Sequence, residues 1–388
     1  MPHNKKMDLS REDLRKHNRG RLLKLIATGM SLSRSDLAAN MGLTKTAITH
    51  IANEMIELGY VEEAGKEESS RPGRKNIGLD ISEKAPKSVG LLIMRDYIRA
   101  VLCDMKLNIL KDVSVYREWA DKEELTGEIL SAVRKVLPEG TRLGGIGVAS
   151  IGPIDTKEGV IKKPLFFHGI QDVHVGELLE EEFEVPVFCD NDNQSAALAE
   201  HLFGNARGYE DVLMVGMGRG VGSGIIIHGE RFSGHDGYAP EIGHVSIDKD
   251  GPMCTCGRRG CLETYVNSTT NMRNMRDASG RELKFKEYCR LSSELPPLDA
   301  VFLDIVEKLS VGILNLVNLL NPEVVILGHG AVDCPDRYFK LLEDNIHERK
   351  FSNKDKRTLV LKPFFGKDAH VLGGACNVIS RYFNGELL

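Results

Sequence analysis

No apolar run in the sequence approaches the roughly 18 consecutive residues that a membrane-spanning helix needs. The first residues, Met1 to Lys6, are polar, and no apolar signal-peptide region follows them. Of the 388 residues, 41% are hydrophobic and 28% are charged, a composition that excludes collagen-like, coiled-coil and largely disordered chains. We therefore expect a cytoplasmic protein of two or three domains that does not insert into a membrane.

A disulfide framework is also missing. Five of the eight cysteines lie singly along the chain, whereas Cys254, Cys256 and Cys261 lie within one segment of eight residues. Because a cytoplasmic compartment keeps thiols reduced, such a cluster predicts a bound metal rather than disulfide bonds.

The sequence has little net charge, −5, and this charge is unevenly distributed. Residues 1–80 carry 14 Lys and Arg against 11 Asp and Glu, whereas the remaining residues have an excess of acidic side chains. A mildly basic N-terminal segment followed by an acidic remainder is compatible with an N-terminal nucleic-acid-binding module.

Residues 1–82 have the pattern of a helix-turn-helix. After a first helical pattern, Ser33 is placed to cap a short second helix. Gly42 permits the left-handed backbone of a tight turn, and Thr44 is placed to cap a third helix. Ile48 faces inward at helical spacing, which leaves polar side chains on the outer face of this third helix: Lys45, Thr46, Thr49, His50 and Asn53.

A wing is predicted after the third helix. Two short strands, the second over Ile77–Ile81, flank a polar loop that ends in the basic run Arg71–Lys75. The predicted contacts with double-stranded operator DNA come from the third helix and this loop: Thr44, Lys45, Thr46, Thr49, His50, Arg71 and Arg74. The alternative is a helical protein-interaction domain with a solvated charged loop.

From Lys87 the pattern changes to short apolar runs over residues 89–94, 98–104 and 109–115, which predict an antiparallel meander. Strand and helix patterns then follow one another to about residue 327. Strands that are mixed with covering helices indicate α/β lobes.

His244 lies shortly before the three clustered cysteines. One imidazole and three thiolates complete a Cys3His set in which the protein fills all four coordination positions of a zinc ion. His244, Cys254, Cys256 and Cys261 are therefore predicted to bind a structural zinc ion. The alternative is four unrelated residues with three buried thiols.

Other residues near this cluster suggest a ligand site. Glycines alternate from Gly216 to Gly224, which allows either tight strand packing or close approach of a ligand; a strand pattern follows them, so a dinucleotide-binding fingerprint is excluded. The Asx residues 190–193 follow a buried strand, and helix capping accounts for one or two of them. With Glu241 and Glu263 beside the zinc cluster, they offer acceptors that suit a polyhydroxyl ligand.

These residues resemble the motifs of the ROK family, named for repressors, open reading frames and kinases. The matching segments are Glu241–His244, Cys254–Glu263, Asn191–Glu200 and Asn321–Gly328. The resemblance spans nearly the whole chain and implies two actin-like, ribonuclease-H-type lobes around a cleft. It also implies contacts to a sugar from Asn191, Asp192, Glu241, His244 and Glu263, with Asp192 as the base of the family's kinases.

The sequence departs from the family's kinases at positions that hold ATP phosphates. The kinases carry an Asp-x-Gly-x-Thr-like turn, whereas the corresponding turn here is Met94–Ile98, without glycine or threonine. Arg219 stands in place of a usual threonine, His329 interrupts a usual Gly-Gly, and Pro240 replaces a glycine. Because phosphoryl transfer depends on positioning the phosphates, this pattern resembles the family's repressors, which also carry an N-terminal winged helix-turn-helix.

We therefore predict an α/β protein with three domains: a winged helix-turn-helix over residues 1–82, a first lobe over 83–200 completed by the C-terminal helix at about 372–388, and a second lobe with the zinc loop over 201–371. The predicted function is a sugar-responsive transcriptional regulator, specifically a repressor of carbohydrate-metabolism genes. It binds operator DNA as a homodimer or higher oligomer, takes a sugar or sugar phosphate as effector, and has no catalytic residue. The first alternative is an ATP-dependent hexose or N-acetylhexosamine kinase with Asp192 as base. The second is a repressor that is controlled by a protein partner.

Overall fold

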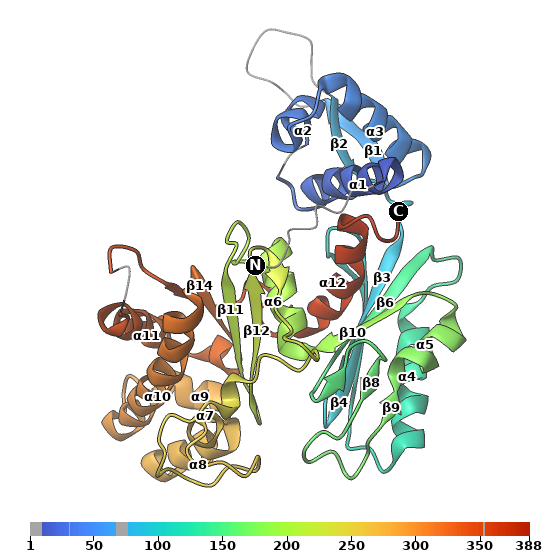
Figure 1. The fold of residues 1–388 in the computed structure, drawn as a ribbon. Helices are drawn as coiled ribbons and strands as arrows, with labels where there is room; N and C mark the ends of the chain where they lie inside the picture. The colour runs from blue at the N-terminus through green and yellow to red at the C-terminus, as the bar shows by residue number, and fades with distance from the viewer. Residues whose placement is uncertain (1–9, 31, 67–76, 352–353) are drawn as a thin grey trace. The chain divides into compact units, whose positions relative to one another are not determined.

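The computed structural model describes residues 10–30, 32–66, 77–351 and 354–388. The chain divides into two compact units (Figure 1). The first unit consists of Met1–Val148, Leu165–Cys189 and Gly374–Leu388, and the second of Ala149–Pro164 and Asp190–Gly373. The three predicted domains have other boundaries than these units, and that division stays a prediction.

The N-terminal helices form the predicted helix-turn-helix: α1 (Arg11–Ala27), α2 (Arg34–Met41) and α3 (Lys45–Glu57). The hydroxyl of Ser33 accepts a hydrogen bond of 3.1 Å from the backbone N–H of Asp36, and the hydroxyl of Thr44 accepts one of 3.2 Å from Ala47. Gly42 follows α2 with a φ of 65°, the left-handed conformation that the turn requires. The predicted caps and turn are confirmed.

Two antiparallel strands follow α3: β1 (Val61–Lys66) and β2 (Ile77–Ile81). The hydrophobic core of this region contains side chains that are at most 1% exposed: Leu22, Leu23, Ile26, Leu37, Ile48, Met55, Val61 and Leu79. The loop between the two strands, with the predicted DNA contacts Arg71 and Arg74, lies outside the described residues.

The first unit also holds a five-stranded sheet with the strand order β10-β6-β3-β4-β5. The five strands are β3 (Lys87–Ile93), β4 (Tyr97–Cys103), β5 (Ile109–Tyr116), β6 (Leu143–Ser150) and β10 (Val187–Asn191). The helices α4 (Lys122–Val136) and α5 (Val175–Phe183) lie between them in the chain. The antiparallel pairing of β3 with β4 and of β4 with β5 confirms the predicted meander. Helix α4 packs on β4 and β5.

The C-terminal helix α12 (Ala369–Phe383) approaches β6 at backbone distance. A Cβ atom on Gly147 would lie 1.8 Å from the carbonyl oxygen of Gly374. The amide of Asn377 donates a hydrogen bond of 3.2 Å to the carbonyl of Val148. Glycine is therefore required at position 147, because any side chain would push the helix off the strand.

The second unit contains a five-stranded sheet in the order β13-β12-β11-β14-β15. The five strands are β11 (Val212–Met217), β12 (Val221–Ile227), β13 (Glu230–Arg231), β14 (Val324–His329) and β15 (Leu359–Leu361). Helix α6 (Asp192–Phe203) precedes them in the chain. Successive side chains of a strand point to opposite faces. Val212 and Met214 accordingly pack with the alanines of α6, whereas Leu213 and Val215 pack with the helices on the other face.

In Figure 1, α6 covers one face of β11 and β12, and α10 and α11 lie on the other side of this sheet. The helices of that side are α7 (Leu262–Val266), α8 (Ser268–Ser279), α9 (Phe285–Leu291), α10 (Pro296–Leu320) and α11 (Asp336–Arg349). The remaining elements are short: β7 (Ile154–Asp155), β8 (Val160–Ile161), β9 (Val173–His174), η1 (Ile242–His244), η2 (Gly330–Asp333) and η3 (Gly366–Asp368). Among the described residues, no helix combines the length and the apolar character that crossing a membrane requires.

Gly147→Ala should lower the free energy of unfolding by roughly 3 kcal/mol, because its methyl group would overlap the backbone of α12. Gly127→Ala, in the interior of α4, is the matched control, since a Cβ atom there has open space around it. That control should gain roughly 0.5–1 kcal/mol from the better helix former. Urea unfolding followed by circular dichroism measures both, and equal midpoints for the two variants would contradict the packing argument.

Candidate functional site

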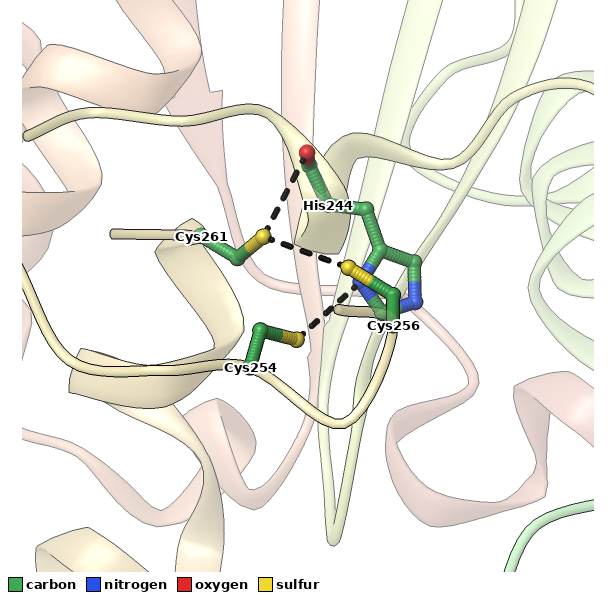
Figure 2. Close-up of side chains that lie close together, drawn as sticks. All are labelled: His244, Cys254, Cys256 and Cys261. Carbon is green, nitrogen blue, oxygen red and sulfur yellow. Dashed lines mark hydrogen bonds between the residues drawn. The ribbon is translucent and has the colours of Figure 1, made fainter. Parts of the chain in front are cut away.

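Four side chains with metal-binding atoms converge in the second unit (Figure 2). His244 ends η1, Cys254 and Cys256 lie in the loop that follows, and Cys261 directly precedes α7. Gly260 has a φ of 65°, so the loop can turn back toward His244 without a Cβ clash. The structure thus brings together all four residues of the predicted zinc site.

The separations of these atoms fit a tetrahedral metal ion. The distance from Cys254 Sγ to His244 Nδ1 is 3.6 Å, and that from Cys256 Sγ to Cys261 Sγ is also 3.6 Å. With zinc–sulfur bonds of about 2.3 Å and zinc–nitrogen bonds of about 2.0 Å, neighbouring ligand atoms of a tetrahedron lie about 3.5–3.8 Å apart. A disulfide would require an S–S distance of about 2.05 Å. The donor set and its spacing therefore fit zinc.

Two of the thiols differ in acidity. The backbone hydrogen bond from Arg258 lowers the pKa of Cys256, which is exposed. Burial raises the pKa of Cys261 to about 12, and the neighbouring cysteines act in the same direction. A cation bound among the thiols would offset the cost of burying the thiolate of Cys261.

The alternating glycines are explained in part by the packing of α6 on β11 and β12. A Cβ atom on Gly216 would lie 1.9 Å from Asn193 Oδ1, and one on Gly222 would lie 2.3 Å from Asn193 Nδ2. One on Gly224 would lie 2.5 Å from the backbone oxygen of Asn193. Of the two explanations that the sequence left open, tight packing accounts for these three glycines.

The Asx residues before α6 have separate tasks. Asp190 forms an ion pair of 2.6 Å with Arg231. Asn191 caps α6, because its side-chain oxygen accepts hydrogen bonds from the backbone N–H groups of Asn193 (3.0 Å) and Gln194 (3.4 Å). The predicted sugar contact Asn191 is thus also the helix cap that the sequence allowed.

Asp192 lies next to two histidines. Its Oδ2 is 3.5 Å from His329 Nε2, and the rings of His329 and His370 stack with their centroids 3.7 Å apart. Burial opposes the ionisation of Asp192, but the two histidines and the backbone N–H of Asn193 outweigh it, so its pKa lies below the ordinary value. Burial lowers the pKa of His370 to about 3, so this imidazole is neutral at physiological pH.

Sequence reasoning missed His370 and treated His329 only as a departure from the kinase pattern. The signal that relates them is the fold, because β14 and α12 bring together residues that are far apart in the chain. Their positions in the sequence give no indication that either histidine lies near Asp192.

Glu241 and Glu263 flank the cysteine cluster. Burial of its carboxyl group raises the pKa of Glu241; the charge of His244 opposes this, and those of Glu263 and Asp192 add to it. The carboxylate of Glu263 accepts a hydrogen bond of 2.9 Å from the backbone N–H of Val221 at the start of β12. The predicted sugar contacts of this unit therefore lie close enough to interact electrostatically, and Glu263 also anchors the glycine-bearing turn.

A hollow with an empty volume of about 340 Å³, part of it open to solvent, lies in the second unit. Its lining includes two predicted sugar contacts, Asn191 and Glu241, with Gln194, Ser223 and Tyr238 beside them. The side chains of this lining offer hydrogen-bond donors and acceptors of the kind that sugar hydroxyl groups need.

The predicted DNA-contacting side chains around α3 that are described lie exposed: Thr44, Lys45, Thr46, Thr49 and His50. On its inner side, Glu54 of α3 forms ion pairs with Arg15 (2.6 Å) and Arg19 of α1. Helix α3 is therefore held by its inner face, and its polar outer face is available to a partner.

Comparison with known proteins places the chain in a family. A family model described as "ROK family" matches residues 88–380. The chain belongs to the ROK family. The segments of the resemblance noted in the sequence, from Asn191 to Gly328, lie inside the matched region.

Relatives of this ROK protein include transcriptional repressors. The xylose repressor of Bacillus subtilis strain 168 is 27% identical over 96% of this chain and 97% of its own length. The DNA-binding transcriptional repressor Mlc of Escherichia coli K12 is 27% identical over 97% of this chain and 96% of its own length. The crystal structure of a ROK family transcriptional regulator, a homologue of Mlc, matches with a TM-score of 0.82 over 97% of this chain and 98% of that one; at 23% identity it shows the shared fold.

A kinase matches less of the chain. The glucokinase of Thermotoga maritima is 27% identical over 67% of this ROK protein and 86% of its own length. About a third of the chain thus has no counterpart in that alignment, whereas the alignments with the repressors leave almost none unmatched.

Cys256→Ser should abolish zinc binding at the cysteine cluster, because a hydroxyl group is a poor substitute for a thiolate ligand. Cys103→Ala is the matched control, since this buried thiol lies in β4 and outside the cluster. Binding is measured as the thiolate-to-metal charge-transfer absorption after reconstitution with Co²⁺. The intensity should disappear in Cys256→Ser and persist in Cys103→Ala; an unchanged spectrum in Cys256→Ser would contradict the site.

Proposed function

We propose that this ROK protein is a sugar-responsive transcriptional repressor of carbohydrate-metabolism genes. The main support is its similarity to two repressors along 96% and 97% of its length, a span that takes in the N-terminal helices. A protein with this task acts on DNA in the cytoplasm and is not an enzyme.

DNA binding is assigned to the winged helix-turn-helix formed by α1–α3, β1 and β2. The outer face of α3 carries Lys45 for phosphates and polar side chains such as His50 for base edges. Arg71 and Arg74 of the loop between β1 and β2 contribute further positive charge. Because one recognition helix reads few base pairs, the protein binds a palindromic operator as a homodimer or a higher oligomer.

Sugar binding is assigned to the hollow beside the cysteine cluster. Asn191 and Glu241 line it, and Asp192, His244 and Glu263 complete the set of sugar contacts. Carboxylates accept hydrogen bonds from sugar hydroxyls, and an amide nitrogen donates them. The effector is therefore a neutral monosaccharide or its phosphate. It changes DNA affinity only if it binds the operator-competent and operator-free states unequally.

The zinc ion has a structural task in this proposal. His244 presents Nδ1 to the cysteines, so the metal would hold this ring and leave Nε2–H as a donor toward a sugar hydroxyl. All four positions around the metal are filled by protein, which leaves none for an activated water.

A sugar kinase is the second candidate. Asp192 favours it, because this buried carboxylate matches the base of the family's kinases. His329 opposes it, because its ring lies against the glycine-bearing end of β11, where a Cβ atom on Gly216 would be 2.6 Å from His329 Cδ2. Backbone that faces an imidazole in this way is not free to surround a phosphate.

Operator binding and sugar response should be separable by mutation. A DNA site is first selected from a random pool on immobilised protein, and its affinity is then measured by fluorescence anisotropy with D-xylose, D-glucose, N-acetylglucosamine, glucose 6-phosphate and N-acetylglucosamine 6-phosphate. Lys45→Ala should weaken operator binding by roughly fivefold and reduce the salt slope by about 1, without changing sugar affinity. Glu241→Gln should leave operator affinity unchanged and reduce the effect of the sugar at least tenfold.

Failure of the selection to enrich any DNA site would contradict the repressor proposal, and equal loss of both functions in Glu241→Gln would contradict the assigned sugar site. Sugar-dependent ADP release with ATP and Mg²⁺ tests the kinase. The Thermotoga maritima glucokinase serves as positive control. Silence on every sugar is expected, and turnover on any of them would support the kinase instead.

A further inference from the structure

A second group of metal-binding atoms lies in the second unit, apart from the cysteine cluster. Asp192 begins α6, His329 ends β14, and His370 lies in the first turn of α12. The carboxylate oxygen and the two imidazole nitrogens that they offer all lie within 4.8 Å of one another. Asp192 is also a proposed sugar contact, but neither the proposed sugar site nor the zinc site accounts for the two histidines beside it.

The group is enclosed by protein. His370 is 3% exposed, Asp192 is 4% exposed, and the side chain of His329 is 19% exposed. Buried polar atoms are normally paired, because an unpaired one loses its hydrogen bonds to water without a replacement. Nevertheless, His370 Nε2 is buried without a hydrogen-bond partner among the described residues, and the same is true of Asn193 Oδ1.

One of these unsatisfied atoms, Asn193 Oδ1, borders the same space as the ring of His329. A Cβ atom on Gly216 would lie 1.9 Å from Asn193 Oδ1 and 2.6 Å from His329 Cδ2. The rings of His329 and His370 are stacked with centroids 3.7 Å apart. The ring of His370, which carries the orphaned Nε2, therefore packs directly against His329 within this cluster.

The backbone of His329 is a third, independent observation. Its φ is 53° and its ψ is −126°, a conformation that favours glycine. A non-glycine residue in such a region is strained, and strained residues of this kind cluster at functional sites. The chain thus holds an imidazole beside Asp192 at a position where glycine would be more stable.

We propose that Asp192, His329 and His370 bind a divalent first-row transition-metal ion. Two imidazoles and one carboxylate form a three-ligand set that Zn²⁺ and Fe²⁺ occupy in proteins, with an open position for a further ligand. The 3.5 Å between Asp192 Oδ2 and His329 Nε2 matches the roughly 3.3 Å expected for two ligand atoms at about 2.0 Å from one zinc ion. The metal would be the missing partner of His370 Nε2.

Protonation suits this role. The burial that lowers the pKa of His370 keeps its imidazole neutral, which is the form that binds metal, and the carboxylate of Asp192 is ionised. This proposal does not rest on the proposed function, because it concerns only the three clustered side chains and not the binding of DNA.

The test is the number of metal ions per chain in the full-length protein. The protein is stripped with a chelator, loaded with Co²⁺, freed of unbound metal on a desalting column and analysed for cobalt by mass spectrometry. Wild type should retain two equivalents. His329→Gly removes one ligand and relieves the backbone strain, so it should fold and retain one, with the thiolate charge-transfer absorption intact.

Cys256→Ser should retain one equivalent without charge-transfer absorption, and its weak visible bands should report nitrogen and oxygen ligands. His347→Gln is the matched control, since it removes a histidine whose buried Nδ1 also lacks a partner among the described residues but which lies outside both clusters. It should retain two equivalents. A single equivalent in wild type would overturn the proposal, and so would two equivalents in folded His329→Gly.

Discussion

The close approach of Asn193 to the backbone of β11 and β12 is the constraint on which the ligand-facing part of the second unit depends. Any Cβ atom at Gly216, Gly222 or Gly224 would overlap atoms of Asn193, so the sequence must carry glycine there for α6 to lie on these strands. Because α6 is held so close, its first turn lies directly over the glycines of these two strands.

This placement decides which groups meet Asp192. Strand β14 runs parallel to β11, and the register sets Gly216 opposite Gly328 and Met217 opposite His329. The glycine-bearing end of β11 offers no side chain to fill the space, so the ring of His329 lies against Gly216 and reaches Asp192. A side chain that replaces glycine on one strand is thus accommodated by the glycines of its neighbour.

The parts of this protein that could be predicted from sequence are those whose chemistry is local. Ser33, Gly42 and Thr44 act on backbone within three residues, and the three cysteines gather metal-binding atoms within one loop, so each could be recognised without knowing the fold. The glycine run could not be interpreted in the same way, because the partner that requires it, Asn193, is supplied by a different helix. His370 could not be identified at all, since its contact with His329 depends on how α12 follows β15. The role of Asn191 was ambiguous for a related reason. Helix capping depends only on neighbouring residues, whereas a contact with a sugar depends on the fold.

The cysteine loop influences the ligand hollow without lining it. Glu241 precedes η1, which His244 ends, and Glu263 lies in the first turn of α7, which Cys261 precedes. A metal that fixes His244 and Cys261 together therefore fixes the two backbone segments from which both carboxylates project.

Glu263 extends this effect to the turn before β12, because its carboxylate accepts a hydrogen bond from the backbone N–H of Val221. The hydrogen bond ties the metal loop to the same strand that α6 packs against. The positions of Asn191, Glu241 and Glu263 are consequently not independent, and a loss of metal would disturb them together even though none of the three is a ligand.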